Sequence, residues 1–240
     1  MSTFIVILSN VIPLYLLVGV GYIAGRLLKI EKESIAKLLI YVITPVVVFD
    51  GASSRSFSAE LFLIPLIFFC IASGLAIFFY YALKTVRSDS TRNILAFASG
   101  AGNTGYFGLP VALALFGDSV LPIVTACILG TVLFENTVGF FLAARSSYTV
   151  AGSLKKLIRL PAVYAFVLGI LFSLYSIHPQ NSVGNVFTMF RGAYSILGMI
   201  MIGLPLSHIH RIHIDLFAIL LLSVARFILW PVLVGCSILF

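Results

Sequence analysis

Hydrophobic residues follow one another along this chain in long runs, and short stretches between the runs carry most of the charged residues. A run of about 20 apolar residues is long enough to cross a bilayer as a helix. Strict alternation of apolar and polar residues, which is typical of a membrane β-barrel, does not stand out. The pattern predicts an all-α polytopic membrane protein with eight spans: Phe4–Leu28, Ile35–Phe49, Leu61–Leu83, Asn93–Phe116, Leu121–Ala144, Leu160–Ile177, Gly192–Leu206 and Leu216–Phe240.

The composition agrees with a protein that is solvated by lipid. Of the 240 residues, 61% are hydrophobic and 10% are charged, whereas soluble domains carry about 25% charged residues. The core of a soluble domain of this length could not hold so much apolar surface. The three cysteines lie in three different runs without a pairing or metal-ligand spacing, so we expect them to pack as small apolar residues.

The basic residues predict how the chain is oriented in the membrane. Most of them lie in the loops after the first, third, fifth and seventh runs, whereas the other loops carry only Arg55 and Arg191. Cytoplasmic loops are enriched in Lys and Arg. The N-terminus of this multi-pass cell-membrane protein is therefore predicted to face outward. The net charge of +7 is explained by these loops, where Lys155, Lys156 and Arg159 would anchor at lipid headgroups, and it does not indicate nucleic-acid binding.

Prolines and glycines recur in matching order in the two halves of the chain. The pairs are Pro13 with Pro161, each followed eight residues later by a glycine (Gly21 and Gly169), Pro45 with Pro205, and Pro65 with Pro231. Five spans separate the first pair, so the two units would have opposite orientations. Inverted repeats are typical of secondary transporters, whose sites form at the bilayer midplane. The alternative is that these residues are simply frequent in membrane helices.

The fourth run contains the segment with the strongest signal for function. Gly102, Gly105 and Gly108 recur at every third position ahead of Pro110, and this combination disfavours a continuous helix. A break inside a membrane must face a cavity or protein, and the positive ends of broken helices can hold an anion. The predicted substrate site comprises Asn103, Thr104, Gly105, Gly108 and Pro110. The alternative is a close helix–helix contact through small residues.

The same segment resembles a known family. Asn103-Thr104, Gly108-Leu109-Pro110 and Leu115-Phe116-Gly117 are similar to the fourth-helix motif of the auxin efflux carrier family, which includes plant carriers and bacterial permeases. Weaker similarities lie at Tyr41 to Pro45 and at Leu160 to Gly169. The resemblance extends over the whole chain in span order.

This resemblance implies ten helices in two inverted five-helix repeats, of which spans 9 and 10 are absent from this chain. Residues 1–52 and 160–207 would form a scaffold, and residues 61–144 and 216–240 would form a moving transport domain. Broken helices would cross at Pro110, and Asn103 would contact a substrate carboxylate. The resemblance also implies small organic anions as substrates and a possible homodimer.

Four further charged residues lie inside spans or at their ends. Glu135 could carry a coupling proton or could be a carboxyl hydrogen-bonded to Asn136 or Thr131. Arg226 could attract an anion, pair with Glu135, or reach toward an interface. Asp50 and Asp118 are expected to be solvated residues at span ends.

Three histidines, His208, His210 and His213, cluster after the seventh run, but their spacing matches no zinc signature, so we expect a headgroup-facing loop and no metal. No nucleotide-binding loop is present in the sequence, and no cofactor is expected.

The leading hypothesis is a secondary carrier that moves a small organic anion by alternating access. The alternative is a non-transporting fragment or regulatory subunit that pairs with a complete homologue. An intramembrane enzyme using Glu135 or Asp118 is disfavoured because the spans contain no second acid, histidine or nucleophile placed to act with them.

Overall fold

The computed structural model describes residues 3–54, 59–87, 90–143, 160–209 and 214–239. Nearly all residues in these ranges are helical, and the ranges contain no strand. The predicted all-α class is therefore confirmed. Several residues that the sequence analysis discussed lie outside the described ranges: Arg55, Lys155, Lys156, Arg159, His210 and His213.

Within the part of the chain that the structure describes, six helical stretches are long and apolar enough to cross a membrane. One of them, Ser90–Ala143, has 54 residues. One crossing needs only about 20 residues, so this stretch is long enough for both of the spans predicted there. Gly117 separates these two spans with a φ of 69°, a conformation that glycine adopts readily. The predicted sixth span corresponds to a helix of only 14 residues, α10 (Pro161–Leu174). Within the described residues, each of the eight predicted runs is mostly helical.

The chain forms two compact units, each built from segments that are distant in the sequence. Unit 1 comprises Met1–Leu61, Asn103–Ile128 and Leu160–Ile212. Its helices are α1 (Thr3–Leu28), α2 (Lys32–Leu38), α3 (Thr44–Ser53), α6 (Leu109–Phe116), the first part of α7 (Leu121–Phe134), α10 and α11 (Gln180–Leu206). The assignment of helices to a scaffold and a transport domain, and the inverted repeat, stay predictions.

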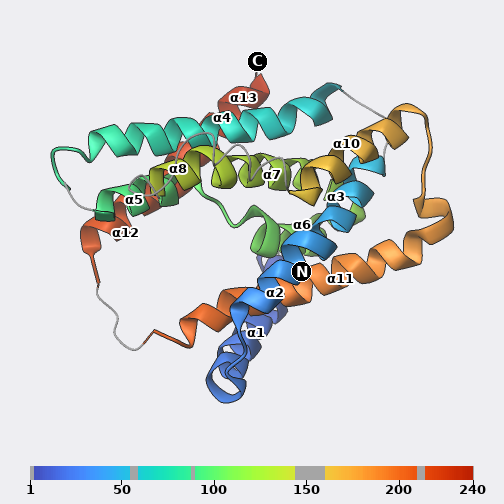
Figure 1. Ribbon diagram of the computed structural model, residues 1–240, viewed down its shortest axis with the longest axis horizontal. Coiled ribbons are helices and arrows are strands. Elements are labelled where there is room, and N and C mark those ends of the chain that lie inside the picture. Colours follow the sequence, from blue (N-terminus) through green and yellow to red (C-terminus); the bar gives the residue numbers. More distant parts are fainter. Residues whose placement is uncertain (1–2, 55–58, 88–89, 144–159, 210–213, 240) are drawn as a thin grey trace. The chain divides into compact units, whose positions relative to one another are not determined.

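Within unit 1, α1 packs against α11, and glycines on both helices allow the close approach. Figure 1 shows the two helices. A Cβ at Gly21 would collide with the backbone of Ile200, and a Cβ at Gly203 would collide with the carbonyl of Val18. Small residues are the usual means by which membrane helices approach one another closely. A larger side chain at either position would push the two helices apart.

A second close contact in unit 1 holds α3 between α10 and α7. Figure 1 shows α10 beside α3. Gly169 of α10 faces Ala52, and Gly51 faces the side chain of Thr125 in α7. These contacts bury the C-terminal half of α3, including Asp50.

Unit 2 comprises Phe62–Gly102, Leu129–Arg159 and His213–Phe240. Its helices are α4 (Ala59–Ala82), α5 (Ser90–Gly100), the last part of α7, α8 (Phe140–Ala143), α12 (Leu216–Val224) and α13 (Trp230–Leu239). Its core combines small and aromatic residues: Phe134 stacks on Phe97 with ring centroids 6.0 Å apart. Gly100 lets α5 approach Ala72 of α4 closely.

Four π turns interrupt the helices of the described ranges: η1 (Leu39–Ile43), η2 (Thr104–Gly108), η4 (Glu135–Gly139) and η5 (Ala225–Leu229). Three of them end two residues before a proline, namely Pro45, Pro110 and Pro231. Proline has no N–H to donate, and its ring collides with the carbonyl one turn earlier in an α-helix. A widened turn directly ahead of the proline relieves this collision without ending the helix.

Two predicted spans are longer in the structure than in the prediction. The second is a helical stretch over Lys32–Ser53 rather than Ile35–Phe49. The seventh is part of α11, which begins at Gln180 rather than at Gly192. The added segments contain polar residues such as Asp50, Gln180 and Arg191, so hydropathy alone excluded them. Their helical structure is explained by the polar contacts that they make with one another.

Candidate functional site

The fourth span is broken at residues 101–103, between α5 and the π turn η2. Asn103 has φ −80° and ψ 58°, which is outside the helical region. The chain turns back into a helix where the Gly108 N–H donates to the Asn103 carbonyl at 3.0 Å. Pro110 then lies in the first turn of α6, where its missing N–H costs little. The break thus falls in the glycine-rich stretch ahead of Pro110, as the sequence predicted.

The five residues of the predicted substrate site all belong to unit 1. Asn103 is exposed, and Thr104, Gly105 and Gly108 are partly buried. Pro110 is buried. Asn103 and Thr104 therefore place neutral hydrogen-bonding side chains beside backbone that has left the helix, and this is the arrangement that polar ligands use at broken membrane helices.

Aromatic residues hold the π turn η2 in place inside unit 1. Tyr106 and Tyr194 of α11 have ring centroids 5.7 Å apart, and Phe107 meets Tyr15 of α1 edge to face at 5.7 Å. A Cβ at Gly105 would collide with the Tyr194 hydroxyl. The absent side chain of Gly105 is thus what allows α11 to approach this turn.

In unit 2, side chains from the last helices bind the open end of α5. The last four carbonyls of a helix have no helical donor, and lipid does not supply one. The Arg226 guanidinium donates to the Ala98 carbonyl at 2.7 Å and to the Ala101 carbonyl. The Trp230 indole N–H donates to the Ser99 carbonyl at 3.0 Å. Arg226 therefore acts as a cationic cap on a broken helix, a role that sequence reasoning missed.

Glu135 begins the π turn η4 in the middle of the fifth span and is partly buried. Its neighbour Asn136 donates to the Val132 carbonyl at 2.9 Å rather than to Glu135. Among the described residues, the ion pairs do not include one between Glu135 and Arg226. The role of Glu135 as a proton carrier stays a prediction.

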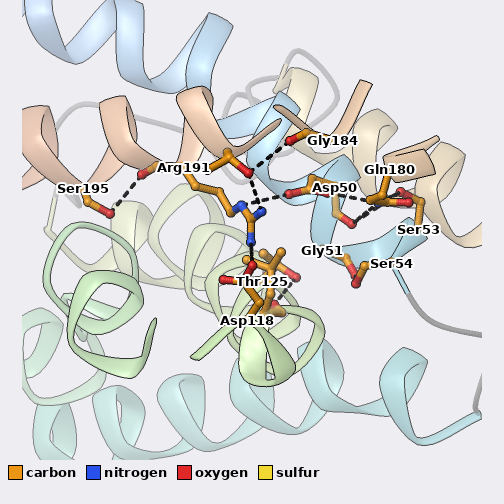
Figure 2. A network of polar contacts seen from close by, with 12 residues as sticks. Asp50, Gly51, Ser53, Ser54, Asp118, Thr125, Gln180, Gly184, Arg191 and Ser195 are labelled. Atoms are coloured by element: carbon orange, nitrogen blue, oxygen red, sulfur yellow. Dashed lines mark hydrogen bonds and ion pairs between the residues drawn. The ribbon is translucent and has the colours of Figure 1, made fainter. Parts of the chain in front are cut away.

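A network of charged residues in unit 1 corrects the expectation for Asp50 (Figure 2). The Asp50 side chain is only 2% exposed, and its Oδ2 lies 3.3 Å from Nε of Arg191. Asp50 is therefore a buried, paired carboxylate and not a solvated residue. Asp118 is 75% exposed, and its Oδ2 lies 2.9 Å from Nη1 of the same arginine.

Further hydrogen bonds fix Asp50 in its place. Nε2 of Gln180 lies 3.0 Å from the Asp50 carbonyl oxygen, its Oδ1 and the Ser53 hydroxyl. Nδ1 of His178 lies 3.2 Å from the Ser53 carbonyl oxygen. The sequence carried one signal for this network, because Arg191 is a rare basic residue on the predicted outer side.

A nearly all-helical chain with several spans and a broken helix inside an apolar stretch has the architecture of a multi-pass membrane transporter. The comparison with protein families gives the same class. A family model described as membrane transport protein matches residues 6–239. The chain belongs to this family, the auxin efflux carrier family of membrane transporters, which is not a family of enzymes.

Two relatives are themselves described as uncharacterized transporters. One, from Methanothermobacter thermautotrophicus, is 27% identical over 207 residues, which are 83% of this chain and 68% of the relative. The other, from Methanocaldococcus jannaschii, is 28% identical over 234 residues, which are 92% of this chain and 75% of the relative.

Proposed function

We propose that the protein is a secondary carrier that moves a small organic anion across the membrane by alternating access. The observation that carries this proposal is the break at residues 101–103 within an apolar span. Non-helical backbone at membrane depth is tolerated only against protein or a water-filled cavity. Transporters use such breaks to bind substrates.

The chemistry around the break favours an anionic substrate. The helix that resumes after Asn103 directs its positive N-terminal end toward the break. Asn103 and Thr104 can donate hydrogen bonds without bringing a negative charge. A carboxylate is the common group that such neutral donors and a helix N-terminus bind together.

Uptake of labelled acetate, malonate and succinate into proteoliposomes tests this proposal. The variant Asn103→Ala should raise the half-saturating concentration of the transported anion by about tenfold or more, because a hydrogen bond to a charged group contributes about 1.5–3 kcal/mol. The matched control is Asn185→Ala, an exposed asparagine of α11, which should transport normally. Equal uptake by both variants would reject the site, and no uptake of any carboxylate by the wild type would reject the substrate class.

The proposed proton coupling through Glu135 is tested separately. Glu135→Gln keeps the shape of the side chain but cannot lose a proton. We expect its uptake to continue without the dependence on a pH gradient that the wild type shows. The measurement is initial uptake with and without an imposed gradient, and an unchanged gradient dependence would show that Glu135 does not carry the proton.

A further inference from the structure

Arg191 lies on the face of α11 that meets the predicted substrate segment. Tyr194, which faces Gly105, and Gly198, which faces Tyr106, follow Arg191 by three and seven residues. Positions i, i+3 and i+7 share one face of a helix. The rise of about 1.5 Å per residue places Arg191 about 4.5 Å along the axis from Tyr194. The backbone of Arg191 is therefore about one turn from the residue of α11 that faces Gly105, and its guanidinium meets Asp118 in the turn that follows α6.

The contacts of Arg191 leave it suited to bind a carboxylate. Its side chain is 13% exposed, with Nε beside Asp50, Nη1 beside Asp118 and Nη2 donating to the Thr188 hydroxyl at 3.0 Å. A guanidinium has five N–H donors in a planar fork that matches a carboxylate. Among the described residues, Nε lies near Asp50 without a hydrogen bond, and Nη1 and Nη2 each have two N–H groups but one partner, so donors of Arg191 are left over for a ligand.

The two acidic partners of Arg191 differ in how firmly they are held. Asp50 is buried, is fixed by Gln180, and cannot leave the guanidinium without leaving a charge uncompensated. Asp118 is 75% exposed, and an exposed ion pair contributes little to stability because water competes for both groups. Asp118 is thus the partner that another carboxylate can replace.

The backbone next to Asp118 permits such a replacement. Asp118 follows Gly117, whose φ of 69° and ψ of −166° are open essentially to glycine alone. No atom lies within 4 Å of the position that a Cβ would take at Gly117. The short turn η3 (Gly117–Val120) thus follows an uncrowded glycine and holds Asp118 at an exposed position.

We propose that Arg191 is a carboxylate-binding residue of the carrier and that Asp118 occupies this position when substrate is absent. The substrate's carboxylate would exchange with Asp118 at Nη1, while Asp50 keeps the guanidinium oriented. One carboxylate replaces another, so the local charge is unchanged. The residues of the predicted site are uncharged, and Arg226 is engaged with carbonyls, so Arg191 supplies a positive charge that the site otherwise lacks. This inference rests on the proposed transport of an organic anion.

Binding of sodium malonate to the purified protein in detergent tests the inference without depending on transport. The readout is the rise in unfolding temperature during a titration, with sodium chloride at equal ionic strength and neutral malonamide as ligand controls. Asp118→Asn should lower the half-saturating malonate concentration by about two- to fivefold, because the internal competitor is removed. Arg191→Gln should raise it by about tenfold or more.

The matched control is Arg87→Gln, which breaks the ion pair between Arg87 and Asp215 at 2.8 Å in unit 2 and should bind malonate like the wild type. If Arg191→Gln does not fold, Asp118→Asn decides alone, because it leaves the buried pair intact. Unchanged or weaker binding by Asp118→Asn overturns the inference, while malonate binding by the wild type still supports the proposed function. If the wild type binds neither malonate nor acetate nor succinate, both proposals fall.

Discussion

At the scale of single residues, the two carboxylates that share Arg191 illustrate how burial decides the energy of an ion pair. Both lie within ion-pair distance of the guanidinium, but one is 2% exposed and the other 75%. Removing one partner of a buried pair leaves a charge without compensation and costs about 3–5 kcal/mol. An exposed pair contributes only about 0–1 kcal/mol.

Asp50→Ala should therefore lower the free energy of unfolding by about 3–5 kcal/mol, and Asp118→Ala should change it by less than about 1 kcal/mol. Thermal or denaturant unfolding in detergent measures both variants against the wild type. Similar losses for the two variants would mean that burial does not separate their energies as the structure indicates.

At the scale of elements, a glycine of α1 affects the packing on α11 only when it lies on the face of α1 that contacts α11. Gly21 faces the backbone of Ile200, whereas no atom lies within 4 Å of a Cβ at Gly19. Gly21→Ala should destabilise the protein by about 1–3 kcal/mol, because the helices must separate. Gly19→Ala should be neutral or stabilising by up to about 1 kcal/mol. The pair is compared by thermal unfolding, and equal effects would contradict the close contact.

The capped end of α5 gives a second prediction at this scale. Arg226→Gln should lower the free energy of unfolding by about 1.5–3 kcal/mol, because carbonyls at membrane depth lose a charged donor. Arg226→Lys should recover part of the loss with a single ammonium group. Arg87→Gln is the control for removing an arginine. Full stability of Arg226→Gln would show that other groups satisfy these carbonyls.

At the scale of the whole molecule, the distribution of basic residues predicts an outward N-terminus. Glu31, after the first span, should then face the cytoplasm, and Ser119, between the fourth and fifth spans, should face outward; both are exposed. With the three natural cysteines replaced, Ser119→Cys should react with a membrane-impermeant thiol reagent on intact cells, and Glu31→Cys should react only after lysis. The reverse result would invert the predicted topology.

The general architecture could be predicted from the sequence, because long apolar runs and the glycine-rich stretch before Pro110 determine the local structure of their own segments. The Asp50–Arg191 pair could not, because these residues belong to helices that are distant in the sequence and lie at polar span ends that hydropathy excludes. Arg226 stood out as a charge within a span, but its partners are backbone carbonyls of another helix, and backbone carbonyls carry no sequence signal.

The π turns ahead of Pro45, Pro110 and Pro231 have a consequence for how the sequence can change in evolution. A π turn holds one residue more than the α-helical turn it replaces, so deleting one residue there returns the helix to its ordinary winding. The same deletion elsewhere in a helix rotates every following side chain by about 100° relative to its neighbours. Segments such as Leu39–Ile43, which continue into helices on both sides, are therefore positions where the loss of a single residue should let the flanking helices keep their facing surfaces.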